Sequence, residues 1–124
     1  MLLMARKDLK ALAHMRDPAL FHDEIFGFHA QQAIEKALKA WLSLCERRYP
    51  LTHSLRALLA LLEEEGCDVG CFMHAVRYSA FAVQFRYEEA VPLVESVDRE
   101  AAIADATAVV EYVERLIGAA GPSP

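Results

Sequence analysis

The sequence lacks any apolar run long enough to cross a membrane, and the charged residues Arg6, Lys7 and Asp8 follow the first methionine almost at once. A membrane span needs about 20 predominantly apolar residues, and a secretory signal also needs an uninterrupted apolar segment. Cysteine is scarce as well: the three cysteines are an odd number, which suits free thiols in a reducing compartment. We therefore expect a cytoplasmic protein with no membrane partner.

The motifs of several enzyme classes are also missing. The chain has no glycine-rich phosphate loop, no Ser-His-Asp set with supporting motifs and no paired-carboxylate signature. Cys67, Cys71 and His74 can face together on one helical turn, but no convincing fourth ligand for structural zinc stands nearby. We predict that the protein binds no metal and needs no cofactor. The net charge of −5 argues against unspecific nucleic-acid binding, so any RNA contact needs a local basic cluster or a partner.

What the chain does have is helical periodicity. Its 124 residues, 55% of them apolar and 25% charged, are enough for one domain with a substantial core. No stretch has the alternating pattern of a strand, and no segment repeats. Apolar residues at three- and four-residue steps predict five helices, near residues 3–15, 21–48, 55–65, 69–85 and 98–117. Thr52 or Ser54 can cap the third of these helices, and Ser96 or Asp98 can cap the last.

These helices predict an all-α protein, an up-and-down four-helix bundle with an additional helix, because short loops favour antiparallel neighbours. The domain spans residues 1–118, and residues 119–124 form a frayed tail. Residues 86–95 are typical of an ordered connector, because they keep apolar side chains that can pack. Along the second helix, small residues would let another helix approach closely, and we expect a homodimer: Ala30, Ala33, Ala37 and Ala40.

The second predicted helix also carries a polar stripe, which consists of His29, Gln32, Lys36 and Lys39. These side chains can present hydrogen-bond donors and positive charge to a phosphate, a nucleotide or the carboxylates of a partner. The alternative is an ordinary solvated helix face, in which Glu35 and Lys39 form one of the helix-spaced pairs.

Other candidate residues lie outside this helix and have similar alternatives. His53 either joins the site, caps the third helix or packs against Trp41. Arg86 and Tyr87 either contribute to binding or lock the connector, since both side chains can cover apolar surface while donating hydrogen bonds.

Together these segments carry a resemblance to a known family. The run from Phe28 to Ala40, then Thr52-His53-Ser54-Leu55, then Arg86-Tyr87, resembles the signature of HEPN domains (higher eukaryote and prokaryote nucleotide-binding). The similarity covers nearly the whole chain. It implies a four-helix up-and-down bundle with an extra helix, usually dimeric. Prokaryotic members are often encoded beside a minimal nucleotidyltransferase, as a two-component pair or a toxin–antitoxin module, and several branches are metal-independent endoribonucleases.

The ribonuclease branches use an arginine and a histidine four to six residues apart, late in the chain. Here Arg77 and Arg86 occupy that region, but no histidine follows His74. Arg48 and His53 have the required spacing, although they lie between the second and third predicted helices. Chance matches of this kind are expected in a chain with five histidines.

Two functions from different classes stay open, with a dimeric helical adaptor as a third. The first is binding of a nucleotide, or of a minimal nucleotidyltransferase partner, through the polar stripe together with His53, Arg86 and Tyr87. The second is metal-independent cleavage of RNA, in which a histidine acts as general acid–base and an arginine stabilises the charge on phosphate. The candidate catalytic residues are His29, His53, Arg77 and Arg86. We favour binding, because the late histidine is missing.

Overall fold

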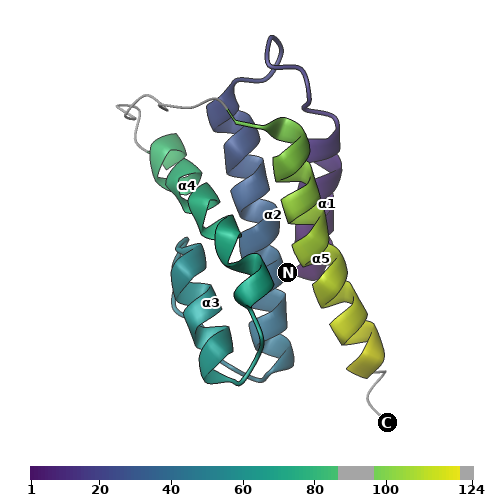
Figure 1. Ribbon diagram of the computed structural model, residues 1–124, viewed down its shortest axis with the longest axis vertical. Coiled ribbons are helices and arrows are strands. Elements are labelled where there is room, and N and C mark those ends of the chain that lie inside the picture. The colour runs from purple at the N-terminus through teal and green to yellow at the C-terminus, as the bar shows by residue number, and fades with distance from the viewer. Residues whose placement is uncertain (87–96, 121–124) are drawn as a thin grey trace.

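The computed structural model describes residues 1–86 and 97–120, without the side chains of residues 83–86 (Figure 1). All regular structure in this part of the chain is helical, which confirms the predicted all-α class. The elements are α1 (Leu2–Ala13), α2 (Asp23–Leu44), α3 (Leu55–Glu64), the 3₁₀ helix η1 (Gly70–Tyr78), α4 (Ser79–Arg86) and α5 (Arg99–Ala120). None of the helices described is long and apolar enough to cross a membrane.

Four helical segments form an up-and-down bundle: α1, α2, the continuous segment η1–α4, and α5 (Figure 1). Contacts between these segments show their relative directions. Arg6 pairs with Glu114 near one end of α1, and Arg16 pairs with Glu100 beyond the other end, so α1 and α5 are antiparallel.

The additional helix is α3, which runs in the same direction as α2. The connection formed by residues 45–54 returns along α2 and brings His53 within 2.9 Å of Glu35. At the other end of α3, Cys67 lies beside Cys45. The start of α3 therefore lies beside the middle of α2 and its end beside the end of α2, so the two helices run the same way. The predicted bundle with an additional helix is confirmed.

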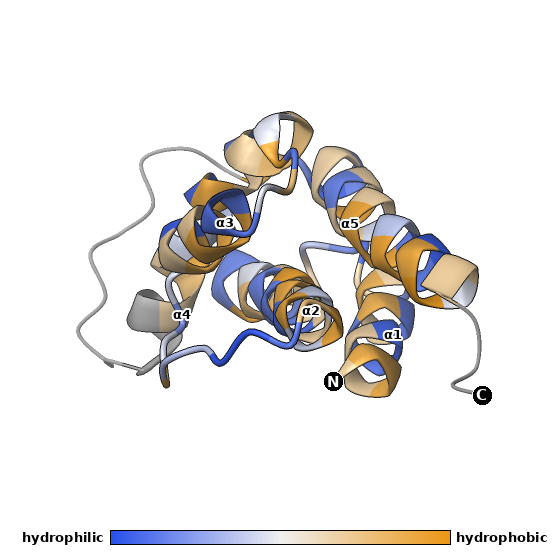
Figure 2. Ribbon diagram, turned by 90° about the horizontal axis from the view of Figure 1, so that it is seen from below, coloured by the Kyte–Doolittle hydropathy of each residue, from blue (hydrophilic) through white to orange (hydrophobic). Residues whose placement is uncertain are grey.

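The core is built around α2, which lies between α1 and α5 on one side and α3 and α4 on the other (Figure 2). Between these neighbours, the small residues of α2 allow close packing within one chain. Ala30, Ala33 and Ala37 are completely buried in this way. Their burial corrects one argument for a homodimer, since these alanines are not available to a second copy. Aromatic contacts extend the core, with the Trp41 ring centroid 6.1 Å from that of Phe72 and 5.1 Å from that of Tyr112.

Hydrogen-bonded caps set the starts of two helices. Ser54 Oγ accepts a hydrogen bond from the Ala57 amide at 3.1 Å and caps α3. Asp98 Oδ1 accepts one from the Ala101 amide at 3.0 Å and caps α5. In both cases the cap is one of the two residues that the sequence offered.

The end of α2 differs from the prediction. The helix ends at Leu44 instead of near Arg48, because Glu46 takes the left-handed conformation with φ 57°. The Arg47 amide then donates to the Leu42 carbonyl at 2.9 Å, which closes the helix with a reversal usually made by glycine. The chain has therefore left the helix well before Pro50. The first helix also ends early, at Ala13 instead of Met15, because its last amides make tight three-residue turns.

The fourth predicted helix is wound as a 3₁₀ helix over its first nine residues, η1, before it becomes α4. Side chains three residues apart eclipse one another in a 3₁₀ helix. The buried residues follow that spacing: Val69, Phe72, Ala75, Tyr78 and Phe81. The α-helical spacing expected instead would have turned Ala80 inward, but Ala80 is exposed.

At the other end of the chain, α5 continues through Ala119 and Ala120 instead of ending at Gly118, since alanine is the best helix former. The first two residues of the predicted tail therefore belong to α5 in the structure. The rest of that tail, residues 121–124, and most of the predicted connector lie outside the described residues.

Candidate functional site

The residues of the polar stripe engage different partners. Lys36 Nζ donates to Asp8 Oδ2 of α1 at 2.6 Å, and His29 Nδ1 lies 3.4 Å from Asp8 Oδ1. Lys39 Nζ instead donates to Glu35 Oε2 of α2 itself at 3.0 Å. The sequence predicted one surface open to a ligand, but Asp8 already engages two of its members.

Glu35 is the centre of the network beside α3. Its carboxylate, in a residue only 4% exposed, receives hydrogen bonds from Gln31 Nε2 at 2.7 Å and Lys39 Nζ at 3.0 Å, and lies 2.9 Å from His53 Nδ1. Burial alone would raise the pKa of Glu35, but the hydrogen bonds from Gln31, His53 and Lys39 outweigh it and hold the pKa below its usual value. Glu35 therefore stays ionised at neutral pH.

Gln31 joins the 45–54 connection to α2. Its Nε2 also donates to the His53 carbonyl at 3.1 Å, so it fixes both the backbone and, through Glu35, the imidazole of His53. Its Oε1 accepts from Gln32 Nε2 at 2.7 Å. Sequence reasoning named neither Gln31 nor Glu35 as a site residue. Their spacing with Lys39, four residues at each step, was the available signal.

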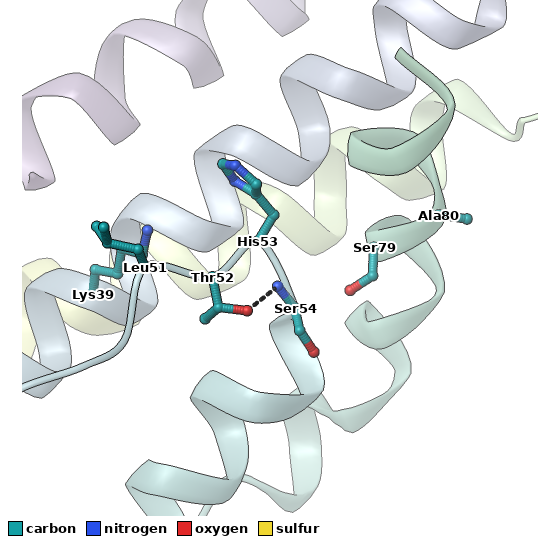
Figure 3. A pocket seen from close by; sticks show the side chains of 7 residues that line it. All are labelled: Lys39, Leu51, Thr52, His53, Ser54, Ser79 and Ala80. Atoms are coloured by element: carbon teal, nitrogen blue, oxygen red, sulfur yellow. Dashed lines mark hydrogen bonds between the residues drawn. The ribbon is translucent and has the colours of Figure 1, made fainter. Parts of the chain in front are cut away.

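A cavity of about 730 Å³ opens beside this network (Figure 3). Its lining comes from α2, from the end of the 45–54 connection and from the start of α4: Lys39, Leu51, Thr52, His53, Ser54, Ser79 and Ala80. We call it the donor pocket, because polar side chains from all three segments line it. Among the predicted site residues, the structure brings Lys39 and His53 together here.

Three hydroxyl groups in the donor pocket already accept hydrogen bonds from backbone amides. Thr52 Oγ1 accepts from the Ser54 amide at 3.0 Å, and Ser54 Oγ accepts from Ala57 at 3.1 Å. Ser79 Oγ, which comes from α4, accepts from the Leu55 amide at 3.0 Å. A hydroxyl that accepts in this way still has its own hydrogen to donate. The positive end of α3 also lies here, so an oxygen-rich anion would meet both donors and a favourable dipole.

Lys39 adds the positive charge. Its ammonium group is buried, lies 5.6 Å from the centre of the Tyr49 ring and uses one hydrogen bond on Glu35. An ammonium group has three donors, so Lys39 can serve Glu35 and a ligand at the same time.

Arg77, another candidate, belongs to a separate cluster between η1 and α5. Asp105 Oδ2 accepts from Arg77 Nη2 at 2.6 Å and from the Tyr78 hydroxyl at 2.7 Å, while His74 Nε2 lies 3.0 Å from Asp105 Oδ1. Burial, reinforced by Asp105, raises the pKa of Tyr78 to about 12, so the phenol stays protonated as a donor. Burial opposes ionisation of Asp105, but these donors lower its pKa overall.

Two further predicted site residues cannot be placed. The Arg86 side chain and Tyr87 lie outside the described residues. Within the part of the chain that is described, no three His, Cys, Asp or Glu side chains are grouped so as to hold a metal ion. The absence of a metal stays a prediction.

Comparison with known proteins gives one match. No curated protein and no solved structure matches the chain. The family model of the HEPN domain matches residues 1–116, from the start of α1 through most of α5. This chain therefore belongs to the HEPN domain family.

Proposed function

We propose that this HEPN domain binds the phosphate group of a nucleotide in the donor pocket. The observation that supports the proposal most strongly is the convergence of Lys39 with the hydroxyls of Thr52, Ser54 and Ser79 on one cavity. Each hydroxyl oxygen accepts a hydrogen bond from a backbone amide, which fixes its position. Its own hydrogen can therefore be donated to a ligand without further ordering of the chain. Such donors suit the several oxygen atoms of a phosphate group.

The charge pattern supports the same ligand. The chain has a net charge of −5, so an anion needs a local site at which positive charge is concentrated. Lys39 forms an ion pair with Glu35, but that contact uses only one of the three donors of its ammonium group. His29, Lys36 and Gln32 do not line the donor pocket: His29 and Lys36 contact Asp8, and Gln32 donates to Gln31.

Calorimetric titration tests this proposal, with the four ribonucleoside 5′-monophosphates and inorganic phosphate as probes. Lys39→Met removes the ammonium group, and Ser79→Ala removes a hydroxyl. The loss of a charge-assisted hydrogen bond is worth roughly 1.5–3 kcal/mol, so we expect Lys39→Met to weaken binding at least tenfold. Lys36→Met is the matched control, since Lys36 pairs with Asp8 of α1 and does not line the pocket. Equal losses in the two lysine variants, or no binding of any probe by the wild type, would contradict the proposal.

The partner part of the proposal has a different basis. Membership of the HEPN family supports a role connected with nucleotides or RNA, and the resemblance implies a minimal nucleotidyltransferase as partner, in a toxin–antitoxin-like pair. Size-exclusion chromatography of the purified chain, alone and mixed with a nucleotidyltransferase encoded beside it, measures both homodimer and complex. A complex without nucleotide binding by the HEPN chain would favour the adaptor alternative.

Cleavage of RNA is a second candidate function, favoured by the pairing of Glu35 and His53. A carboxylate 2.9 Å from Nδ1 fixes the orientation and tautomer of the imidazole, which is what a general acid–base needs. Incubation with RNA in the presence of a chelator tests it. Cleavage that His53→Gln abolishes and His22→Gln leaves intact would establish catalysis, whereas binding without cleavage would leave the first proposal alone.

A further inference from the structure

Two cysteines far apart in the sequence meet where two helices end. Cys45 caps the C-terminus of α2, and Cys67 follows the turn that ends α3. Their sulfur atoms are 3.9 Å apart, and both residues are partly exposed. A small oxidant can therefore reach either thiol, and the other thiol of the pair already lies in contact with the one that is attacked.

Backbone hydrogen bonds hold each thiol in its position. Beyond Cys45, the Arg47 amide donates to the Leu42 carbonyl at 2.9 Å, and the Cys67 amide itself donates to the Leu62 carbonyl at 3.0 Å. Arg47 also bridges the two helix ends, with an ion pair of 3.0 Å to Glu64. The contact between the sulfurs thus follows from the way both helices are terminated, and it does not depend on a flexible loop.

We propose that Cys45 and Cys67 form a reversible disulfide bond, which makes this pair a site of thiol modification by low-molecular-weight disulfides. The Cys67 thiolate attacks one sulfur of glutathione disulfide, and one glutathione leaves as a thiolate that takes up a proton. Cys45 then attacks the mixed disulfide at Cys67, and the second glutathione leaves in the same way. Two protein thiols are oxidised, and one glutathione disulfide is reduced to two molecules of glutathione.

The order of these steps follows from the environment of Cys45. Burial, and then the neighbouring Cys67, raise the pKa of the Cys45 thiol. Cys45 is therefore the poorer first nucleophile, and we assign it the second attack. The ring that the disulfide closes, residues 45–67, contains α3 and four residues of the donor pocket: Leu51, Thr52, His53 and Ser54. Oxidation would restrict the motion of that wall of the pocket. Its effect on ligand binding rests on the proposed function, but formation of the disulfide bond does not rest on it.

The test uses the full chain with Cys71→Ser, which removes the exposed third thiol and leaves the pair intact. The protein is equilibrated in chelated buffers with increasing ratios of oxidised to reduced glutathione, then alkylated and digested with trypsin. We expect a linked pair of peptides, residues 40–47 and 57–77, that a reductant separates. The oxidised form should also melt about 5–10 °C higher than the reduced form, because the bond restricts the unfolded chain.

The control chains carry Cys45→Ser or Cys67→Ser in the same background, and their circular dichroism spectra establish that they fold. Neither should gain the linked peptides or the higher melting temperature. The proposal is overturned if both thiols of the test chain stay free at the most oxidising ratio. It is equally overturned if each cysteine carries glutathione and no peptide link forms.

Coupling to the donor pocket has its own readout. The affinity for adenosine 5′-monophosphate is measured for the reduced and oxidised test chain and for the Cys45→Ser control. We expect at least a twofold change on oxidation in the test chain and none in the control. Equal affinities would overturn the coupling alone, and failure of the nucleotide to bind would overturn the coupling together with the proposed function. The peptide link decides the disulfide in either case.

Discussion

Replacing Glu35 by glutamine tests the central interaction of the site. The substitution keeps the size of the side chain and removes its charge, so Lys39 is left with a neutral partner. Lys39 is itself buried, with a side chain only 9% exposed. A buried ammonium group without its counter-ion is expensive, because the protein interior does not replace the hydration that the charge has lost.

The contacts of Glu35 give the expected magnitude. Removing one partner of a buried ion pair typically costs about 3–5 kcal/mol. His53 is 45% exposed, so its share is screened by solvent, and we take the lower end of the range, about 3 kcal/mol. A domain of 124 residues has a total stability on the order of 6–18 kcal/mol. The Glu35→Gln chain should therefore still fold, with a melting temperature about 10 °C lower.

Urea denaturation at neutral pH measures this loss, and a double-mutant cycle assigns it to the ion pair. Lys39→Met removes the opposite charge, and the double variant removes both charges. We expect the double variant to be about 2 kcal/mol more stable than the sum of the single losses predicts. The pair Asp8 and Lys36, which is less buried, serves as the matched control and should show a coupling of about 1 kcal/mol or less.

The pH dependence supplies the result that would refute the reasoning. The pKa of Glu35 is lower in the folded chain than its usual value of 4.5, so the unfolded chain binds its proton first as pH falls. The stabilisation is complete above that value and is lost at lower pH, as the folded carboxylate becomes protonated. The deficit of Glu35→Gln should therefore shrink in acid. A deficit that is absent at neutral pH, or equally large well below pH 4, would contradict the account.

Three further substitutions test the packing and the helix ends, each by urea denaturation. Gly27→Ala should cost about 1–3 kcal/mol, because the added Cβ would lie 2.2 Å from Phe81 Cδ1, and a chain of unchanged stability would contradict that contact. Glu46→Gly should stabilise the chain by about 0.5–1 kcal/mol, because φ is 57° there; a loss would mean that the carboxylate matters more than the backbone. Arg99→Lys should cost about 2–4 kcal/mol, because the ammonium group lacks the planar fork by which Nη1 reaches Met15 while Nη2 reaches Phe21 and Asp23; a fully stable variant would refute this role.

The fold could be predicted because helical periodicity and capping residues are local signals. Ser54 and Asp98 cap the helices that they were expected to open. The errors arose where tertiary contacts choose between local options. The three-residue repeat of apolar positions from Val69 to Phe81 was visible in the sequence, but α-helical spacing fitted several of the same residues. No local rule indicates that the second helix ends at the left-handed turn of Glu46 and not nearer to Pro50.

The site was less predictable than the fold, because polar residues on a helix appear solvated until their neighbours are known. Lys39 and His53 were candidates from their chemistry alone, and both line the donor pocket. Gln31 and Glu35 were not, since a glutamine and a glutamate on an amphipathic helix usually face water. Ser79 comes from another part of the chain, and no spacing in the sequence connects it to His53.

The direction of α3 explains where the pocket lies along α2. The connection returns along α2, so α3 begins beside Glu35 instead of beside Cys45, ten residues or about 15 Å further along that helix. A short antiparallel connection would have placed the start of α3 near Cys45, far from the buried Glu35 and Lys39. With the parallel arrangement, the positive end of α3 and its capping hydroxyls lie where Lys39 already supplies charge. Beside α1, Lys36 and His29 both engage Asp8, and neither of them lines the pocket.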